Sequence, residues 1–193
     1  MPFMVLHLET DDFDAWKPFF DSDKYVKVAE PAGTWTPRIT ADNFQQQLTA
    51  HPNINAAVTP NDDNANAVIA DLQRQKIPAK TFPTTGQDAS IVGLQNILKG
   101  YQCGTVYKPN KTEAQAAAAV AIYLRAGEQV PSSMVNGTTN DSQTKSEVQS
   151  VLLTPKWVTT ANMNDTVIKD GFVKASDVCV PAVKQACTAA GIQ

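Results

Sequence analysis

Between Ala57 and Pro109 the sequence alternates short apolar runs with helical patterns, and this order constrains the fold more than any other feature. Three apolar runs end in polar residues, at Pro60–Asp62, Gly86–Asp88 and Tyr107–Lys108, and a helical pattern follows each run. Strands of an open α/β sheet that end in polar side chains build a ligand crevice at their carboxyl ends. The pattern therefore predicts an α/β domain with a binding site at one edge of its sheet.

Strands and helices alternate in the pattern over most of the chain, which favours a doubly wound, mainly parallel sheet with helices on both faces. Strands are expected at residues 3–8, 25–28, 54–59, 79–84, 104–107 and 151–158, helices at 11–20, 40–50, 64–75, 90–98, 112–125 and 180–190, and an exposed loop at 130–149. Thr40 is expected to cap its helix, and Thr112 with Gln115 has the spacing of a capping box. Gly100 and Gly127 are expected to end two of the helices.

The composition gives no sign of a nucleic-acid-binding or membrane-spanning protein. Of the 193 residues 42% are hydrophobic and 18% charged, the net charge is −3, and the lysines and arginines are scattered rather than clustered. No apolar run approaches the roughly 20 residues of a membrane span. The opening MPFMVLHLETDD lacks the basic and long apolar regions of a secretory signal, so no signal peptide is predicted here.

No set of residues typical of an enzyme or of a bound cofactor is found. The two histidines, His7 and His51, accompany no GxSxG motif, and the sequence has no glycine-rich phosphate loop. Cysteine and histidine are not grouped as zinc ligands. We therefore expect a binding protein without cofactor or metal, and an enzyme on the same fold is the less favoured alternative.

Four residues are candidates for binding a polyhydroxylated ligand. Asn61 and Asp88 follow successive strands, and an amide together with a carboxylate suits adjacent sugar hydroxyls. Both also precede helices, so helix capping is an equal alternative. Lys108 either donates to a ligand hydroxyl or is a solvated charge. Trp35, in a Gly-Thr-Trp-Thr-Pro turn, either stacks on a sugar or covers the edge of the core.

Three cysteines are present. Cys179 and Cys187 lie eight residues apart, and they are either a disulfide formed in an oxidising compartment or two thiols on a helical tail. Cys103 is expected to be a small buried apolar residue.

These segments together resemble a known family. WTP, LTAHPNINAAVTPNDDNA, GQDASIVGLQNILKGYQCGTVYKP and SVLLTPKWVTTANMNDTVIKDGFV look like the periplasmic sugar-binding proteins of ABC importers, and most like the xylose-binding branch of the ribose/galactose-type group. The resemblance implies two α/β lobes, joined by crossing strands, that close on a monosaccharide. It also implies that the family's ligand contacts correspond to Asn61, Asp88 and Lys108, with Trp35 as an aromatic residue near the hinge.

The chain departs from the family in two respects. Its first strand resembles the opening strand of the family's C-terminal lobe, so the resemblance implies that the N-terminal lobe is absent and the chain truncated. Residues 1–109 are then the C-terminal-lobe sheet, 110–149 a helix and loop that belong to the missing lobe, and 150–193 a returning strand and tail. The loop after VLHL reads ETDDFDAW instead of the branch's Asp-Asn-Asn-Ala segment, which puts one ligand contact in doubt.

The resemblance also implies a location and partners. The full-length family is periplasmic or extracellular, associates with the membrane through the permease of an ABC importer, and binds a monosaccharide such as xylose. Half of such a site is expected to bind weakly, because closure between lobes buries most of the ligand. Alternatively, the alanine-rich helix at 112–125 is an association face for a second copy or a separate N-terminal lobe, without sugar binding.

Overall fold

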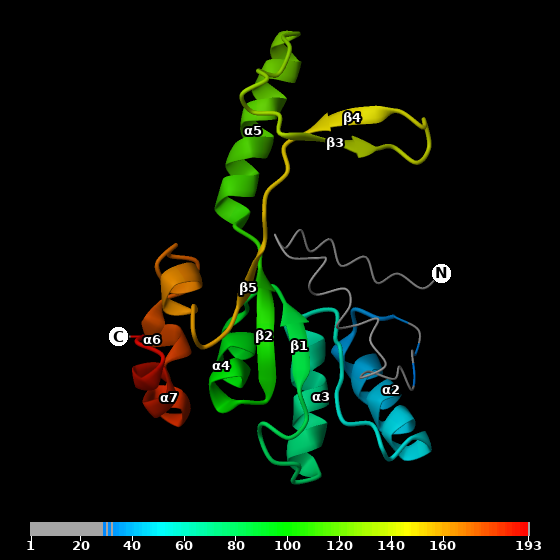
Figure 1. Cartoon of the computed structure of the whole chain (residues 1–193), viewed down its shortest axis with the longest axis vertical. Coiled ribbons are helices and arrows are strands. Elements are labelled where there is room, and N and C mark those ends of the chain that lie inside the picture. Colours follow the sequence, from blue (N-terminus) through cyan, green and yellow to red (C-terminus); the bar gives the residue numbers. More distant parts are fainter. Residues whose placement is uncertain (1–28, 30, 32, 193) are drawn as a thin grey trace. The chain divides into compact units, whose positions relative to one another are not determined.

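The computed structural model describes residues 29, 31 and 33–192, which form two compact units. The first unit contains the described residues up to Lys108 and those from Lys156 onward, and the second is Pro109–Pro155. Figure 1 labels their helices and strands. The elements expected at 3–8, 11–20 and 25–28 lie outside the described residues. None of the described helices is long and apolar enough to cross a bilayer.

A three-stranded mixed sheet is the centre of the first unit (Figure 1). Strand β1 (Thr84–Gln87) pairs in parallel with β2 (Gln102–Tyr107), and β2 pairs antiparallel with β5 (Lys156–Val158). Helix α3 (Asp62–Arg74) packs against β1, and α4 (Ile91–Lys99) packs against β2. Because β1 and β2 are parallel, their carboxyl ends lie at the same edge of the sheet. The α/β fold class expected from the sequence is confirmed.

The helices that follow the strand ends are capped by polar side chains. At the start of α3, Asn61 Oδ1 accepts a hydrogen bond from the backbone N–H of Asn64 at 2.9 Å. At the start of α4, Ser90 Oγ accepts from the N–H of Gly93 at 3.1 Å. Gly100 ends α4 in the left-handed conformation, with φ +80°, as the sequence predicts. These caps fix where each helix meets the sheet edge.

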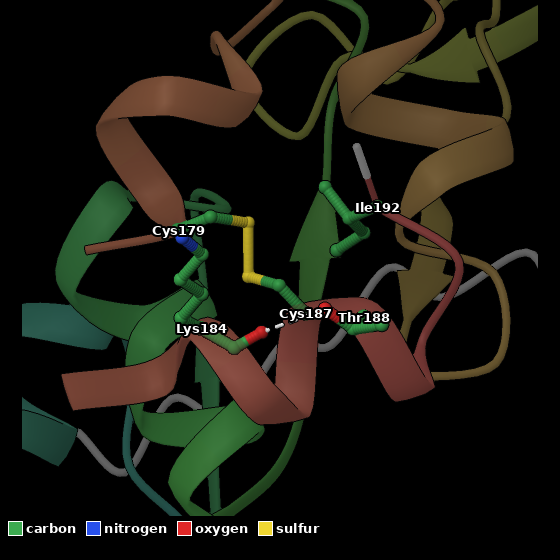
Figure 2. A pocket seen from close by; sticks show the side chains of 5 residues that line it. All are labelled: Cys179, Lys184, Cys187, Thr188 and Ile192. Carbon is green, nitrogen blue, oxygen red and sulfur yellow. Dashed lines mark hydrogen bonds between the residues drawn. A yellow bond between two sulfur atoms is a disulfide. The ribbon is translucent and has the colours of Figure 1, made fainter. Parts of the chain in front are cut away.

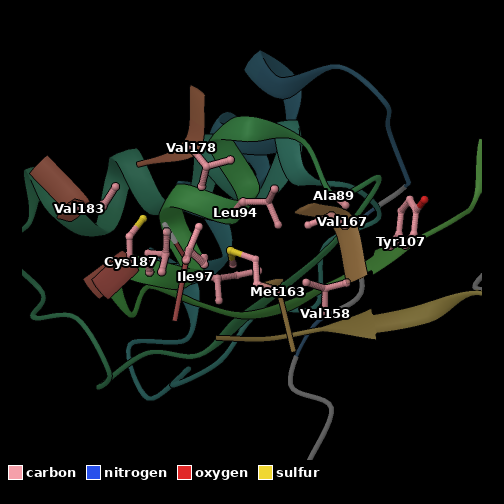
Figure 3. Close-up of a cluster of buried hydrophobic side chains, with 12 residues drawn as sticks. Ala89, Leu94, Ile97, Tyr107, Val158, Met163, Val167, Val178, Val183 and Cys187 are labelled. Atoms are coloured by element: carbon pink, nitrogen blue, oxygen red, sulfur yellow. The ribbon is translucent and has the colours of Figure 1, made fainter. Parts of the chain in front are cut away.

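Two clusters of buried apolar side chains hold the first unit together. The larger one joins α4 and the sheet to a C-terminal segment made of η1 (Asn164–Ile168), α6 (Ala175–Val178), η2 (Pro181–Val183) and α7 (Lys184–Ala189) (Figure 3). Leu94, Val158 and Met163 are among its fully buried members. The smaller cluster joins α2 (Pro37–Ala50) to α3 through Phe44, Val68, Leu72 and Phe82.

Cys179 and Cys187 are joined by a disulfide that ties the end of α6 to α7 (Figure 2). Both cysteines line a cavity of about 240 Å³ together with Lys184, Thr188 and Ile192. The segment 164–192 consists of short helices, so the covalent link adds to the apolar packing against α4 in keeping the segment in place.

Cys103 is exposed, so the expectation of a buried residue is wrong. The register of β1 and β2 shifts at this position, where Thr84 faces Gln102 but Thr85 faces Gly104. Cys103 is the extra residue of this irregularity, and such a residue is left out of the ladder. Burial therefore follows the local register and not the apolar character of the run.

Three of the expected strands are shorter than predicted. Residues 54–59 contribute only one bridge, in which Ala57 pairs with Thr84, and the expected strand at 79–84 begins only at Thr84. Before Thr84, Pro83 has no N–H to donate to a ladder, and Lys80 has a positive φ of 68° that interrupts the extended backbone. The strand expected at 151–158 likewise begins after Pro155.

Two of the expected helix caps are wrong because proline starts the helices earlier. Helix α2 begins at Pro37, which suits the first helical position, so Thr40 lies inside the helix. Helix α5 (Asn110–Ala126) begins after Pro109, whose carbonyl accepts from the N–H of Glu113 at 3.1 Å. Thr112 is consequently a residue of the first turn and not its cap. Gly127 ends α5 with φ +72°, as expected.

The second unit contains α5 and a hairpin of β3 (Gly137–Asn140) and β4 (Glu147–Ser150), so the loop expected at 130–149 is wrong. Side chains build the hairpin: Asn136 pairs with the backbone N–H and carbonyl of Leu152, and Asp141 accepts from Thr144 and from the N–H of Gln143 in the turn. No residue of 109–155 is buried. This unit therefore has no apolar core of its own.

Gly93→Ala is expected to destabilise the first unit by about 1–3 kcal/mol. A Cβ at this position would collide with the buried carboxylate of Asp62, even though alanine ordinarily favours a helix over glycine. The urea midpoint of the variant should fall below that of the unaltered protein. Gly33→Ala is the control, since a Cβ there meets nothing within 4 Å. An unchanged or raised midpoint for Gly93→Ala would show that the close approach is not required.

Candidate functional site

The candidate site lies at the carboxyl edge of β1 and β2, where two of the four predicted residues meet. Lys108 Nζ, just after β2, is 2.7 Å from Asp88 Oδ1, just after β1. Their side chains are 40% and 47% exposed. A half-exposed ion pair of this kind contributes at most about 1 kcal/mol to stability. The pair therefore presents charged groups to solvent more than it holds the fold together.

The turn that carries Asp88 is strained. Asp88 and Ala89 both have positive φ values, +97° and +50°, although neither is glycine. Such conformations cost on the order of 1–3 kcal/mol each and persist where the surroundings enforce them. Asp88 is not the cap of α4, because Ser90 is, so the capping alternative for Asp88 is wrong. The strained backbone thus occurs in the same turn that places the Asp88 carboxylate opposite Lys108.

Asn61 lies near the same edge, because the adjacent Asp62 is hydrogen-bonded to the turn that carries Asp88. The carboxylate of Asp62 accepts hydrogen bonds from the N–H and the hydroxyl of Ser90, two residues beyond Asp88. For Asn61 the capping alternative is observed, since its Oδ1 binds the start of α3. Its Nδ2 group carries two further donor hydrogens. The residue can therefore cap the helix and still donate to a ligand.

Trp35 lies on a loop that is tied to the start of α3. The buried amide of Asn64 donates to the carbonyl of Thr34 at 2.7 Å, and Thr34 Oγ1 accepts from the N–H of Thr36 at 3.0 Å. Trp35 itself is 70% exposed, so it does not cover the core. The loop holds an uncovered indole at the same end of α3 as Asn61.

The carboxylate of Asp62 has a perturbed pKa. Its side chain is only 1% exposed, and burial raises its pKa above the ordinary 3.8. Hydrogen bonds from Gln102 and from the N–H and hydroxyl of Ser90 oppose this shift by stabilising the ionised form. Burial and the nearby Asp170 also raise the pKa of Tyr107, the residue before Lys108.

These groups are suited to hydrogen bonding and stacking with a neutral, hydroxyl-rich molecule. The site combines a carboxylate acceptor, an ammonium donor and an amide donor with an exposed indole ring. Among the residues that the structure describes, no group of three histidine, cysteine or acidic side chains could hold a metal ion.

Asp62 and Ser90 are parts of the site that the sequence did not reveal. An acidic residue in the first turn of a helix is usually a solvated charge that complements the helix dipole, and the sequence Asn61-Asp62-Asp63 fits that role. Gly86 and Gly93 are the only sequence signal of its burial, because they leave the room that the carboxylate occupies. The sequence alone does not show why these two glycines are needed, because only the fold brings them next to Asp62.

An α/β sheet with polar and aromatic side chains gathered at its carboxyl edge is the architecture of a ligand-binding domain. Residues 13–129 match the family described as the periplasmic binding protein domain, and the chain belongs to this family.

The relatives are named as sugar-binding proteins. The chain is 38% identical over 164 residues to the D-xylose-binding periplasmic protein of Escherichia coli K12, covering 84% of this chain and 48% of the relative. It is 34% identical over 159 residues to the protein of the same name from Haemophilus influenzae, covering 80% and 46%. The expectation of a binding protein rather than an enzyme agrees with these names.

A solved structure of a sugar-binding protein also resembles this chain over part of its length. A carbohydrate transporter solute binding protein from Chloroflexus aurantiacus, in complex with D-glucose, superimposes with a TM-score of 0.64 and 27% identity, covering 74% of this chain and 42% of that one. The chain thus spans about half the length of the relatives that it matches.

The titration midpoint of the Asp62 carboxyl is expected above pH 3.8 in the native protein. Between that pH and the raised pKa the native state binds more protons than the unfolded state, so the contribution of Asp62 to stability falls as the pH rises. Carboxyl ¹³C NMR measures the midpoint directly, and the exposed Asp141, whose pKa is lowered by Thr144 and the N–H of Gln143, is an internal control with the opposite shift. A midpoint for Asp62 at or below 3.8 would contradict the assignment.

Proposed function

We propose that this chain is a sugar-binding component of an ABC importer, and that the edge formed by Trp35, Asn61, Asp88 and Lys108 binds a monosaccharide such as xylose. The observation that carries the proposal is the Asp88–Lys108 pair, held on a strained turn although it adds little stability. The carboxylate accepts from hydroxyls, the ammonium and amide donate to them, and the indole ring offers an apolar face to the sugar C–H groups. The names of the relatives support the ligand class.

The affinity of these residues alone is expected to be low. The chain spans about half the length of its relatives, and a ligand enclosed on one side loses less of its surface to the protein than one in a closed pocket. We expect a dissociation constant in the millimolar range, about −4 kcal/mol of binding free energy.

NMR titration with D-xylose tests the proposal. Saturable shifts are expected at the Trp35 indole N–H, the Asn61 side-chain amide and the backbone amides of Asp88 and Lys108. Asp88→Asn keeps the shape of the side chain but removes its charge, and it should abolish the detectable response. Asp165→Asn is the control, because Asp165 is an exposed aspartate of η1 outside the site.

Each outcome of the titration is informative. Saturable shifts that Asp88→Asn removes would support binding at this edge. Shifts elsewhere, or the absence of any response at sugar concentrations about tenfold above a millimolar constant, would contradict it. Micromolar affinity would contradict the inference that these residues provide only part of the family's site.

The same proposal covers location and partner. We propose the periplasm, since the relatives are named as periplasmic proteins and a disulfide between Cys179 and Cys187 suits an oxidising compartment. The partner would be the membrane permease of the importer.

A second candidate function is assembly with another chain through the second unit, as a homodimer or with a separate N-terminal lobe. No residue of 109–155 is buried, and fewer than 50 residues without an apolar core do not form a stable fold alone. In α5, the apolar residues Ile122 and Leu124 are both exposed. They point about 200° apart around the helix axis and therefore lie on opposite faces. The stretch from Ala116 to Leu124 is therefore apolar on all sides, and such a surface is ordinarily covered by other parts of a protein.

Light scattering coupled to size exclusion tests this second candidate. Assembly predicts a mass above the 20.8 kDa of one chain, which Ile122→Lys should reduce to that value because a buried lysine disfavours an apolar contact. Lys111→Glu, at the exposed start of α5, serves as the matched control and should leave the larger mass unchanged. A strictly monomeric protein at high concentration would count against assembly.

A further inference from the structure

Asp62 is a buried acidic residue that contacts the turn carrying Asp88 of the proposed sugar site. Its Oδ2 accepts from the N–H of Ser90 at 2.8 Å and from the Ser90 hydroxyl at 3.0 Å, and its Oδ1 accepts from Gln102 Nε2 at 2.8 Å. The capping bonds of α3 and α4 are accepted by Asn61 Oδ1 and Ser90 Oγ and not by this carboxylate. A buried carboxylate needs such donors, and here they come from β2 and from Ser90, two residues beyond Asp88.

The carboxylate completes the hydrogen bonding of the strained turn. The N–H of Asp88 donates to the carbonyl of Val106 at 2.9 Å, and the N–H of Ala89 donates to Thr105 Oγ1 at 3.1 Å. The third N–H of the turn, that of Ser90, donates to Asp62. Two contacts with β2 and one with α3 therefore hold three consecutive amides.

The surroundings of Asp62 leave it little freedom to move. A Cβ on Gly86 or on Gly93 would collide with its carboxylate oxygens, so both glycines lie directly against them. The Ser90 hydroxyl donates to Asp62 and accepts from the N–H of Gly93, which fixes its orientation. The carboxylate is thus held in one position by β1, β2 and the start of α4. Its hydrogen bonds in turn fix the position of Ser90.

We infer that Asp62 is a positioning residue of the proposed sugar site: its carboxylate holds the turn 88–90 so that the Asp88 carboxylate faces Lys108. This inference rests on the proposed function for its biological meaning, but the geometry that it describes can be measured without a sugar. Removal of the carboxylate leaves the N–H and hydroxyl of Ser90 without a buried acceptor, and the strain at Asp88 and Ala89 then favours relaxation of the turn.

Asp71 provides a matched control on the same helix. It is also 1% exposed, and it pairs with Arg74 and accepts from Gln45 Nε2 at 3.0 Å. Asp71→Ala therefore removes a buried carboxylate of α3 whose partners, Gln45 and Arg74, lie on α2 and α3 and not in the turn 88–90. A purely structural role for Asp62 predicts that the alanine variants at 62 and 71 behave alike.

Amide hydrogen exchange of the full chain separates the two roles. In Asp62→Ala the protection of the Asp88, Ala89 and Ser90 amides, relative to Ile97 inside α4, should fall at least about tenfold, as expected for loss of a charge-assisted hydrogen bond. In Asp71→Ala this ratio should not change. All variants are measured in trimethylamine N-oxide, which favours the compact state and keeps a destabilised variant folded.

Asp62→Asn tests for rescue by a conservative change. Asparagine keeps one oxygen for Ser90, and Gln102 can turn its unpaired Oε1 toward the new amide at the expense of its bond to the Gly104 carbonyl. Most of the protection at 88–90 should therefore return. Equal protection in Asp62→Ala and Asp71→Ala, or no recovery in Asp62→Asn, would overturn the inference.

Titration of the same variants with D-xylose keeps the two proposals apart. We expect the sugar response to be lost in Asp62→Ala and retained in Asp62→Asn and Asp71→Ala. If the unaltered protein does not respond to D-xylose, the proposed function fails while the exchange pattern still decides whether Asp62 positions the turn. If Asp62→Ala relaxes the turn but binds D-xylose as the unaltered protein does, the positioning role is overturned.

Discussion

The buried carboxylate of Asp62 is the interaction on which the arrangement of the first unit depends. It links the first residue of α3 to the start of α4 and to Gln102 at the start of β2. Burying a charge is expensive unless several donors surround it, and here two side chains and one backbone N–H do so. Gly86 and Gly93 are required beside it, because a side chain at either position would occupy the space of the carboxylate. Three hydrogen bonds of one carboxylate thus connect α3 to α4 and β2, and Gly86 of β1 lies directly against it.

The candidate site follows from this arrangement. Parallel pairing of β1 with β2 brings their carboxyl ends to one edge, and the turn after β1 directs Asp88 toward Lys108. The energy of the exposed ion pair is small, whereas the left-handed backbone at Asp88 and Ala89 is costly. The fold therefore maintains this geometry at a cost in stability, which supports the proposed binding role of Asp88. Membership in the periplasmic binding protein family agrees with that interpretation.

The two units differ in what holds them together. The first has two apolar clusters and a disulfide, whereas the second has an alanine-rich helix and a hairpin built from side-chain hydrogen bonds. Because none of the residues 109–155 is buried, the second unit lacks the driving force that stabilises the first. The chain spans about half the length of its relatives, and an uncovered apolar helix in this part is where a contact with another chain or segment would matter most.

The sequence by itself determined the α/β order, the helices α3 and α4 with the glycine that ends α4, and the polar residues after each strand, because periodicity and capping are local properties. It could not determine how β1 and β2 pair, since the register shift at Cys103 depends on the strand that lies opposite. Only the tertiary structure decided that Asp62 is buried, that Ser90 and not Asp88 caps α4, and that Asp88 meets Lys108. Each of these depends on contacts between residues 16 or more apart in the sequence or on a strained turn that such contacts enforce, and no local pattern encodes them.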